Sequence, residues 1–327
     1  MSKYIFVAGG AGYIGSHMIL YLLEKGFEPI VYDNLSEGHR EAVLGGIFIE
    51  GDLSDSEKLK SIFSSYQIST VMHFAASCYV GESVLNPRKY YKNNVFNTIN
   101  LLNNMLDFNI DKFIFSSTCA TYGNPLEIPI TENHPQNPIN PYGNTKLVIE
   151  KVLIDYSKAY NLKSISLRYF NAAGADFKAR IGENHNPETH LIPNVIDAAL
   201  GIKDNLKIFG NDYKTPDGTC IRDYIHVLDL AQAHFLAYKK LEEGYKTSFY
   251  NLGNGKGYSN KEIVNSVEKI LGKKINFEYA PRREGDPPIL IGSSEKAFKE
   301  LGWKPEYYQI DKIVESAINW QIKLRGL

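Results

Sequence analysis

The sequence predicts an α/β fold in which a doubly wound parallel sheet is joined to a second, smaller α/β domain. Short apolar runs alternate with segments of helical periodicity through the first half of the chain. A glycine-rich turn follows the first of these apolar runs. The length of 327 residues also suits two domains better than one.

The first half of the chain contains six apolar runs with the composition of buried strands. They cover residues 4–8, 29–32, 46–49, 70–74, 112–115 and 164–168. Segments with helical periodicity lie between them, near residues 14–25, 55–66, 88–107 and 143–160. Because continuous apolar strands separated by helices form parallel sheets with both faces covered, we expect one such sheet here.

The alternation changes after Asn171. Residues 174–190 and 210–220 are rich in Gly, Asn, Asp and Pro and are predicted to be loops. We predict helices near residues 192–201, 228–241, 259–271 and 309–324, and short strands at 249–252 and 275–279. The expected domains are therefore 1–172 and 173–327, and segments near 224–252 are expected to return to the first domain.

The composition argues against several classes of protein. Lys and Arg total 36 and Asp and Glu total 37, so neither nucleic acid nor an anionic membrane surface is an expected partner. No apolar run approaches the roughly 18 residues that a membrane span needs. The three cysteines, Cys78, Cys119 and Cys220, have no disulfide-framework spacing, and no secretory signal is recognisable. We expect a cytoplasmic protein.

The glycine-rich turn has the spacing of a nucleotide-binding loop. Gly9, Gly12 and Gly15 lie where the first strand turns into the first helix. Glycines permit a tight turn and let backbone N–H groups approach a pyrophosphate at the helix N-terminus. The sequence therefore predicts a dinucleotide site of the Rossmann type.

Two acidic residues after the next strands support this prediction. Asp33 follows Gly15 by 18 residues, close to the spacing of the acid that binds the adenosine ribose. Its charge would repel a 2′-phosphate, which favours NAD over NADP. Asp52 is expected either to contact the adenine edge or to cap a helix that begins near Ser54.

A tyrosine followed four residues later by a lysine places both side chains on one helix face. An ammonium beside a phenol lowers the phenol's pKa, so that the oxygen can accept a hydroxyl proton. Three such pairs occur among the 22 tyrosines: Tyr21/Lys25, Tyr142/Lys146 and Tyr308/Lys312. Position distinguishes them, since only Tyr142/Lys146 follows a helix-start signal after the fifth parallel strand. Thr118, at the end of that strand, completes the predicted catalytic group.

With these motifs in order, the chain resembles the extended short-chain dehydrogenase/reductase family and, within it, the nucleotide-sugar 4-epimerases. The matching stretches are residues 9–17, 33–35, 73–76, 80–83, 90–94, 141–143, 168–171, 209–213, 222–226 and 282–286. The resemblance implies reversible 4-epimerisation of UDP-galactose and UDP-glucose through a 4-keto intermediate, with tightly bound NAD⁺ as transient hydride acceptor. It also implies a homodimer, formed through the predicted helices 88–107 and 143–160.

The same resemblance implies roles for individual residues. The expected cofactor contacts are Gly9, Gly12, Tyr13, Ile14, Gly15, Asp33, Asn34, Asp52, Leu53, Phe74, Ala75, Ala76, Asn93, Ser116, Tyr142, Lys146 and Tyr169. The expected UDP-hexose contacts are Thr118, Asn171, His190, Leu191, Phe209, Arg222, Arg283 and Asp286. Two arginine clusters in one domain suit a diphosphate because guanidinium groups pair with it in a bidentate manner.

The sequence departs from the family pattern at three positions. Cys78 stands where some relatives have a lysine that reaches the cofactor phosphates, and His190 where Asn is common. Leu290 stands where others have a tyrosine that closes the sugar pocket, so N-acetylated UDP-sugars remain an alternative substrate class.

Three other functions and a metal site can be compared with these motifs. UDP-glucuronate epimerisation remains an alternative, and a non-catalytic NAD-sensing protein a remote one. Cys119-Ala120 cannot supply the acid and base of a sugar 4,6-dehydratase. No metal site is expected, because His185 and His190 lie five residues apart with no nearby Cys cluster.

Overall fold

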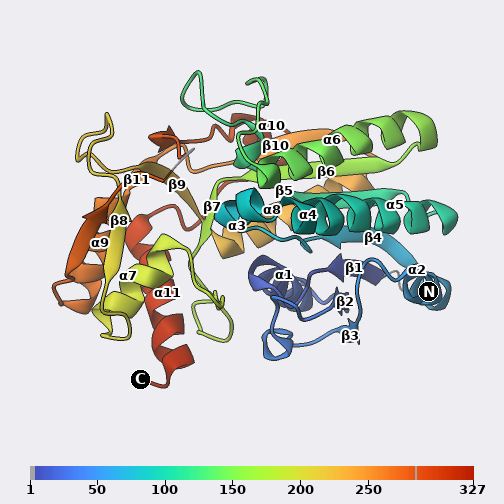
Figure 1. Cartoon of the computed structure of the whole chain (residues 1–327). Helices are drawn as coiled ribbons and strands as arrows, with labels where there is room; N and C mark the ends of the chain where they lie inside the picture. Colours follow the sequence, from blue (N-terminus) through green and yellow to red (C-terminus); the bar gives the residue numbers. More distant parts are fainter. Residues whose placement is uncertain (1–3, 284–285) are drawn as a thin grey trace.

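A computed structural model describes residues 4–283 and 286–327 of the chain (Figure 1). Its largest element is a seven-stranded sheet in the order β10-β6-β5-β4-β1-β2-β3, and every neighbouring pair is parallel. The strands are β1 (Tyr4–Ala8), β2 (Ile30–Asp33), β3 (Ile47–Glu50), β4 (Ile68–His73), β5 (Lys112–Thr118), β6 (Lys163–Tyr169) and β10 (Ser248–Leu252).

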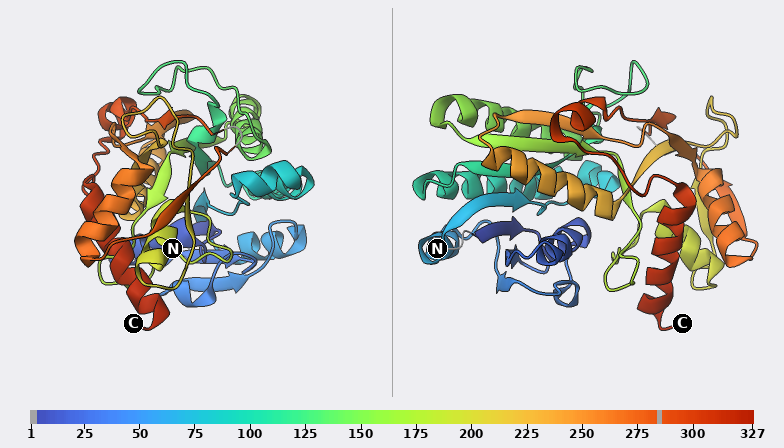
Figure 2. Two further views of the ribbon diagram at one scale, coloured as in Figure 1. Left: turned by 60° about the vertical axis from the view of Figure 1, so that its left-hand side comes forward. Right: turned by 180° about the vertical axis from the view of Figure 1, so that it is seen from behind.

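Helices cover both faces of this sheet. On one face lie α1 (Tyr13–Glu24) and α8 (Val227–Glu242), and on the other α2 (Ser56–Ser65), α5 (Asn97–Asp107) and α6 (Pro141–Tyr160). The helices α5 and α6 lie in front of the sheet in Figure 1. The right panel of Figure 2 shows the molecule from behind, and there α8 lies in front of the sheet.

Successive residues of β1 show why the strands are apolar throughout. Ile5 and Val7 pack in the core under α1 and α8, while Phe6 and Ala8 pack in the core under α2, α5 and α6. Side chains of a strand alternate between faces, so a strand covered on both sides has no polar face. The predicted doubly wound α/β fold is confirmed, and the order 3-2-1-4-5-6 is that of dinucleotide-binding sheets.

A second group of elements lies beside the carboxyl ends of the large sheet, at the left of Figure 1. It contains a four-stranded sheet and a two-stranded sheet with three helices packed around a separate apolar core. Its strands are β7 (Asn171–Ala173), β8 (Leu206–Phe209), β9 (Ile221–His226), β11 (Gly257–Ser259), β12 (Phe277–Ala280) and β13 (Ile289–Leu290). Its helices are α7 (Leu191–Ala199), α9 (Asn260–Leu271) and α11 (Ile310–Arg325).

The chain crosses between the two groups more than once. After β9, the helix α8 packs against α1, and β10 pairs with β6 at the edge of the large sheet. The chain then returns to the smaller group at β11. The division into 1–172 and 173–327 stays a prediction.

The structure differs from the sequence prediction between residues 80 and 107. The predicted helix 88–107 begins as α4 (Pro87–Tyr90), continues as a π-helical turn (Tyr91–Phe96) and ends as α5. Two short helices, α3 (Val80–Leu85) and α10 (Glu295–Leu301), were not predicted. Segments of this length bury too little apolar surface to show a periodic pattern.

No helix among the described residues is long and apolar enough to cross a membrane.

Candidate active site

The carboxyl ends of four parallel strands meet where the strand order reverses. In the sheet, β2 and β3 lie on one side of β1, and β4, β5 and β6 lie on the other side. Open α/β sheets bind their ligands in the crevice at such a point. The residues that end these strands include Thr118 on β5 and Tyr169 on β6, both predicted site residues.

The glycine loop packs tightly against the strand end beside it. Gly9 has φ +78°, and a Cβ there would lie 2.4 Å from the backbone nitrogen of Ala75. A Cβ on Gly15 would lie 2.0 Å from the carbonyl oxygen of Gly9. A Cβ on Gly12 would meet only the Gly9 oxygen, at 3.5 Å, so the space in front of Gly12 is open.

This open space lies at the N-terminus of α1. Gly12 caps the helix without a side-chain hydrogen bond, and the first turn contains no acidic residue. The backbone N–H groups of Tyr13, Ile14 and Gly15 donate no hydrogen bond to any described residue. Free N–H groups and the positive end of the helix dipole attract an anion. The loop therefore fits the pyrophosphate of a dinucleotide.

Asp33 lies directly beside the loop, at the end of β2. Its carboxylate oxygens accept hydrogen bonds from the backbone N–H of Ala11 at 2.9 Å and of Leu35 at 2.8 Å. Burial raises the pKa of Asp33, although both hydrogen bonds act against this rise. The carboxylate is thus held next to the glycine loop with lone pairs left for a further donor.

Asp52 occupies the position after β3 and contacts Asn34. It accepts hydrogen bonds from Asn34 Nδ2 at 2.6 Å and from the Ser54 N–H at 2.8 Å. The alternative that Asp52 caps the following helix is wrong, because α2 begins at Ser56 and its N-cap is Asp55. The neighbouring Leu53 is buried.

The π-helical turn fixes the segment after β4. Asn93 Nδ2 donates to Ser77 Oγ at 3.1 Å, and Asn94 Oδ1 accepts the Ser77 N–H at 2.8 Å. Just upstream, the ring of Phe74 lies 4.6 Å from that of His234. π-helical turns are frequent at functional sites, and this one places Asn93 against Ser77, four residues after the end of β4.

The first turn of α6 brings Tyr142 to the end of β5. Asn140 caps the helix by accepting the N–H of Gly143 at 2.8 Å, and Pro141 occupies the first helical position. Gly143 permits the approach, since a Cβ there would lie 2.4 Å from the Ala120 carbonyl oxygen.

Lys146 lies one turn further along α6 and is only 3% exposed. Its ammonium group donates to the Ser116 carbonyl at 2.8 Å and lies 6.0 Å from the centre of the Tyr142 ring. Burial lowers the pKa of Lys146 to about 8, while Cys78 and Glu150 act to raise it.

The protein groups alone do not lower the pKa of Tyr142. Burial raises it well above the ordinary value, and the hydrogen bond to the Thr118 side chain is the main influence in the other direction. Lys146 is not among the main influences on this pKa in the chain alone, so its expected effect stays a prediction for the complex with the cofactor. The physical reason is that the Lys146 ammonium points to the Ser116 carbonyl rather than to the phenol oxygen.

Tyr169 completes the group at the strand ends. Its hydroxyl forms a hydrogen bond with the Ser116 side chain. Ser116 thus contacts Tyr169 through its side chain and Lys146 through its carbonyl. Five of the predicted site residues are brought together here: Ser116, Thr118, Tyr142, Lys146 and Tyr169.

The predicted substrate residues gather around β9. Arg222 forms an ion pair with Asp286, although the sequence suggested separate contacts for the two. Leu290 is the register partner of Arg222 on the neighbouring β13. The guanidinium of Arg283 lies 4.1 Å from the centre of the Phe209 ring. These side chains form a cationic and aromatic surface.

Asn171 joins this surface to the end of β6. Its Nδ2 donates to the Asp223 carbonyl at 3.1 Å. The two groups of residues are also close enough to interact electrostatically. The charge of Arg222 acts to lower the pKa of Cys119, which follows Thr118, and the charges of His190 and Lys146 act to lower the pKa of Cys78. The predicted catalytic and substrate residues therefore face a common region.

His190 and Leu191 lie at the N-terminus of α7. The His190 side chain is 48% exposed, and its Nδ1 contacts the carboxylate of Glu183. Glu188 and His185 lie in the same cluster, so the loop brings together two histidines and two carboxylates. The prediction of no metal site considered only histidines and cysteines and overlooked these two glutamates.

Cys78 was predicted only as the position of a missing phosphate contact, and two further residues of the site, Glu150 and Arg168, were not predicted. Cys78 is exposed and lies within electrostatic reach of Lys146 and Tyr142. Glu150 and Arg168 form a buried ion pair beneath Lys146. Glu150 follows Lys146 by four residues, and this helical spacing was the signal that could have revealed it.

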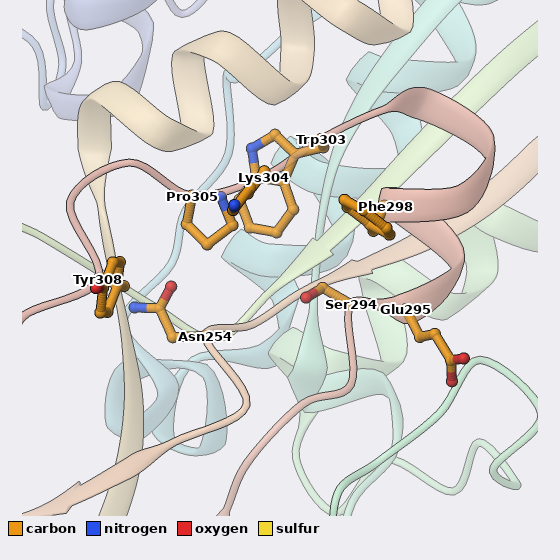
Figure 3. A pocket seen from close by; sticks show the side chains of 8 residues that line it. All are labelled: Asn254, Ser294, Glu295, Phe298, Trp303, Lys304, Pro305 and Tyr308. Atoms are coloured by element: carbon orange, nitrogen blue, oxygen red, sulfur yellow. The ribbon is translucent and has the colours of Figure 1, made fainter.

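An open hollow of about 320 Å³ lies elsewhere on the described surface (Figure 3). It is formed by Asn254, by α10 with the residue preceding it, and by the segment after α10. None of the predicted site residues lines it. The lining residues are Asn254, Ser294, Glu295, Phe298, Trp303, Lys304, Pro305 and Tyr308.

Fold and site together define a nucleotide-dependent enzyme of the short-chain dehydrogenase/reductase type. The family model described as GDP-mannose 4,6 dehydratase matches residues 6–317. A UDP-glucose 4-epimerase of Halalkalibacterium halodurans is 54% identical over 97% of this chain and 95% of its own.

Two solved structures agree with this relationship. UDP-glucose 4-epimerase from Brucella ovis in complex with NAD has a TM-score of 0.95 and 49% identity, over 98% of this chain and 99% of its own. The Bifidobacterium longum enzyme in complex with NAD⁺ and UDP has a TM-score of 0.94 and 38% identity, over 99% of each chain. The chain belongs to the UDP-glucose 4-epimerase family, whose members are NAD-dependent isomerases.

Proposed function

We propose that this chain catalyses the reversible 4-epimerisation of UDP-galactose and UDP-glucose, with Tyr142 as the acid–base residue. The observation that carries the assignment is the convergence of Tyr142, Lys146 and Thr118 at the carboxyl end of β5. The two other Tyr/Lys pairs lack such a neighbourhood: Tyr21 packs against Phe235, and Tyr308 is 56% exposed.

The reaction needs a group that takes and returns one proton. Tyr142 as phenolate accepts the proton of the sugar C4 hydroxyl as C4 gives up its hydride. It returns that proton to the keto oxygen when, after the sugar has turned over, the hydride is returned to the opposite face of C4. Thr118 holds the reacting oxygen by a hydrogen bond. NAD⁺, when bound, supplies the hydride acceptor and a positive charge. This positive charge favours the phenolate form of Tyr142, whose pKa the chain alone leaves raised.

Lys146 and the glycine loop hold the cofactor in this proposal. Lys146 is positioned by the Ser116 carbonyl and donates to the nicotinamide ribose. Asp33 binds the adenosine ribose, Asp52 lies at the adenine edge, and the N-terminus of α1 binds the pyrophosphate.

The substrate surface binds the UDP portion. Arg222 and Arg283 pair with the diphosphate, and Phe209 approaches the uracil. Asp286, which holds Arg222 in the structure, binds the uridine ribose. The sugar itself is free to turn between the two half-reactions because these contacts hold only the nucleotide.

Replacing Tyr142 by Phe tests the assignment. The variant should lose about 10²–10⁴-fold in turnover of UDP-galactose, the size of an acid–base contribution. Its bound NAD and melting temperature should equal those of the wild type. Tyr308→Phe is the matched control, because it alters another Tyr/Lys pair and should leave turnover unchanged. Equal turnover of Tyr142→Phe and wild type would refute the role.

A homodimer is also proposed, through the helical segments 88–107 and 143–160 that the sequence suggested. Leu102 and Met105 of α5 are fully buried in the core of the chain, so other side chains of the first segment make the contact. Nearby, Val84, Leu85 and Phe96 are 60%, 87% and 62% exposed, a patch that a second copy would cover. Light scattering should show a dimer that Leu85→Glu dissociates.

A cytoplasmic location is proposed because all three cysteines are free thiols.

A further inference from the structure

The loop between β7 and α7 contains a compact group of side chains with no part in the proposed proton transfer, although one of them, His190, is a predicted UDP-hexose contact. Within eight residues it provides Glu183, His185, Glu188 and His190. One potential ligand atom from each residue lies within 4.8 Å of the other three. Glu183, His185 and Glu188 are 7%, 12% and 11% exposed in their side chains, so three of the four groups are largely withdrawn from water.

Three of the distances within this group are close to those between neighbouring ligands of one small ion. His185 Nδ1 lies 3.3 Å from Glu183 Oε1 and 3.5 Å from Glu188 Oε2, and His190 Nδ1 lies 3.4 Å from Glu188 Oε1. Ligands about 2.0–2.1 Å from a tetrahedral zinc ion are roughly 3.4 Å apart. His190 Nδ1 contacts Glu183 Oε1 at 2.5 Å, which is closer than two ligands of one ion, so an ion at this site replaces that hydrogen bond and separates the two atoms.

His185 gives a second, independent indication. Its Nδ1 is buried but makes no hydrogen bond to a described residue, although Glu183 Oε1 is within 3.3 Å. A buried polar atom without a partner costs free energy, and a bound ion is one way in which a protein can satisfy it. The atom therefore points into the group without being aligned on either carboxylate.

The backbone of the loop is anchored from outside, so the side chains are held in place. The Glu183 carbonyl accepts hydrogen bonds from Trp320 Nε1 at 2.8 Å and Gln321 Nε2 at 3.1 Å, both on α11. Glu188 Oε1 accepts the N–H groups of Thr189 and His190 at 2.8 Å each. Oriented ligands lower the entropic cost of binding an ion.

We propose that Glu183, His185, Glu188 and His190 bind one divalent transition-metal ion of the zinc type. Imidazole nitrogen and carboxylate oxygen are both zinc ligands, and mixed donors of this kind disfavour Mg²⁺ and Ca²⁺, which prefer oxygen alone. Two carboxylates and two neutral imidazoles also balance the charge of the ion.

The site is structural, because four protein ligands leave no open position for a substrate. By linking the four side chains, the ion closes the loop into a ring. It also fixes the position of His190, which immediately precedes Leu191 and α7. It also lies against Tyr13 of the nucleotide loop and Tyr79, whose rings are 6.3 and 5.9 Å from that of His185. The inference stands independently of the proposed reaction.

Metal analysis of the full-length protein tests the inference. The chain, expressed with zinc and dialysed against metal-free buffer, should retain about one equivalent of zinc per chain. Substitution by Co²⁺ should give the visible d–d absorption of tetrahedral coordination, and Mg²⁺ should not compete for the site. A zinc content near zero together with no cobalt spectrum would overturn the proposal.

Two conservative variants locate the ion. His185→Gln and Glu188→Gln should each weaken zinc binding by at least about 10–100-fold, the loss seen when even an outer partner of a metal ligand is removed. Glu41→Gln is the matched control, since Glu41 is 79% exposed and lies outside the group, and should keep its zinc. Bound NAD, measured in each sample, shows whether the fold survives. Folded variants that bind zinc like the wild type would place the ion elsewhere and refute the site.

Discussion

The carboxylate of Glu150 and the guanidinium of Arg168 form a bidentate ion pair that is almost completely buried. Arg168 donates from Nε at 2.8 Å and from Nη2 at 2.7 Å, and the Arg168 and Glu150 side chains are 5% and 2% exposed. Ser117 and Gln136 also donate to the carboxylate. The pair therefore joins α6 to β5 and β6 directly beneath the proposed catalytic residues.

Breaking this pair should destabilise the whole chain. Glu150→Gln removes the charge but keeps the size of the side chain, so Arg168 remains buried without its counter-charge. The expected loss in the free energy of unfolding is about 3–5 kcal/mol, measured by urea denaturation of the holoenzyme. The surface variant Glu57→Gln, at a side chain that is 86% exposed, should change it by less than about 0.5 kcal/mol. Equal effects of the two substitutions would contradict this interpretation of the pair.

The sequence was most informative where local chemistry and chain order agreed. Asn140-Pro141 marks the start of α6 by a cap and a fixed φ, both local properties. Choosing Tyr142 among three candidate tyrosines depended on strand order, which the alternation of apolar runs already determines. The glycine loop was identifiable because its spacing is imposed by backbone contacts with Ala75 and within the loop.

Features that depend on contacts distant in sequence could not be predicted in this way. Arg222 pairs with Asp286, which lies 64 residues further along the chain, and no local sequence pattern predicts this contact. The π-helical turn at Tyr91–Phe96 is specified by Ser77 and Thr145, which bind Asn94 from two other segments. The raised pKa of Tyr142 depends on burial, which exists only in the folded chain.

Cys78 should be the thiol that reacts in the native enzyme. It is exposed, whereas Cys119 and Cys220 are 9% and 1% exposed. Desolvation by the surrounding protein raises the pKa of its thiol, although His190 and Lys146 act to lower it, so alkylation should be slow at neutral pH and accelerate as the pH rises. Peptide mapping after iodoacetamide treatment should find Cys78 labelled first.

Bound nucleotide should slow this labelling, since Cys78 lies beside the proposed catalytic residues. Excess UDP is expected to reduce the rate of Cys78 alkylation several-fold, with Cys78→Ser as the unlabelled control. Labelling at an unchanged rate in saturating UDP would place the nucleotide away from Cys78.

Asp223 should make stability fall with rising pH. Burial raises its pKa from 3.8 to about 7, although the N–H groups of Asn254, Gly292 and Gly255 act against the rise. Between these values the folded chain keeps a proton that the unfolded chain releases. The contribution of Asp223 is therefore complete below pH ~4 and is lost as the pH rises toward 7, by at most about 1.4 kcal/mol per pH unit.

Asp223→Asn isolates this contribution. The variant loses hydrogen bonds at every pH, so the slope of the unfolding free energy between pH 5 and 7 is the quantity to compare. That slope should be more positive in Asp223→Asn than in the wild type, because the group whose contribution falls with pH is gone. Parallel curves for the two proteins would show that Asp223 is ionised throughout.

Leu290 should control which sugars the enzyme accepts. It is paired in register with Arg222, so its side chain lies next to the proposed diphosphate contact. The family resemblance implies a larger tyrosine at this position in some relatives. A leucine leaves room for an N-acetyl group that a tyrosine would fill. Leu290→Tyr should therefore lower kcat/KM for UDP-N-acetylglucosamine by about 10-fold or more and change that for UDP-glucose little, within the selectivity that steric contacts provide. Leu290→Met conserves volume and should retain the wild-type ratio of the two substrates. If Leu290→Tyr slowed both sugars equally, position 290 would support the fold of β13 rather than select the sugar.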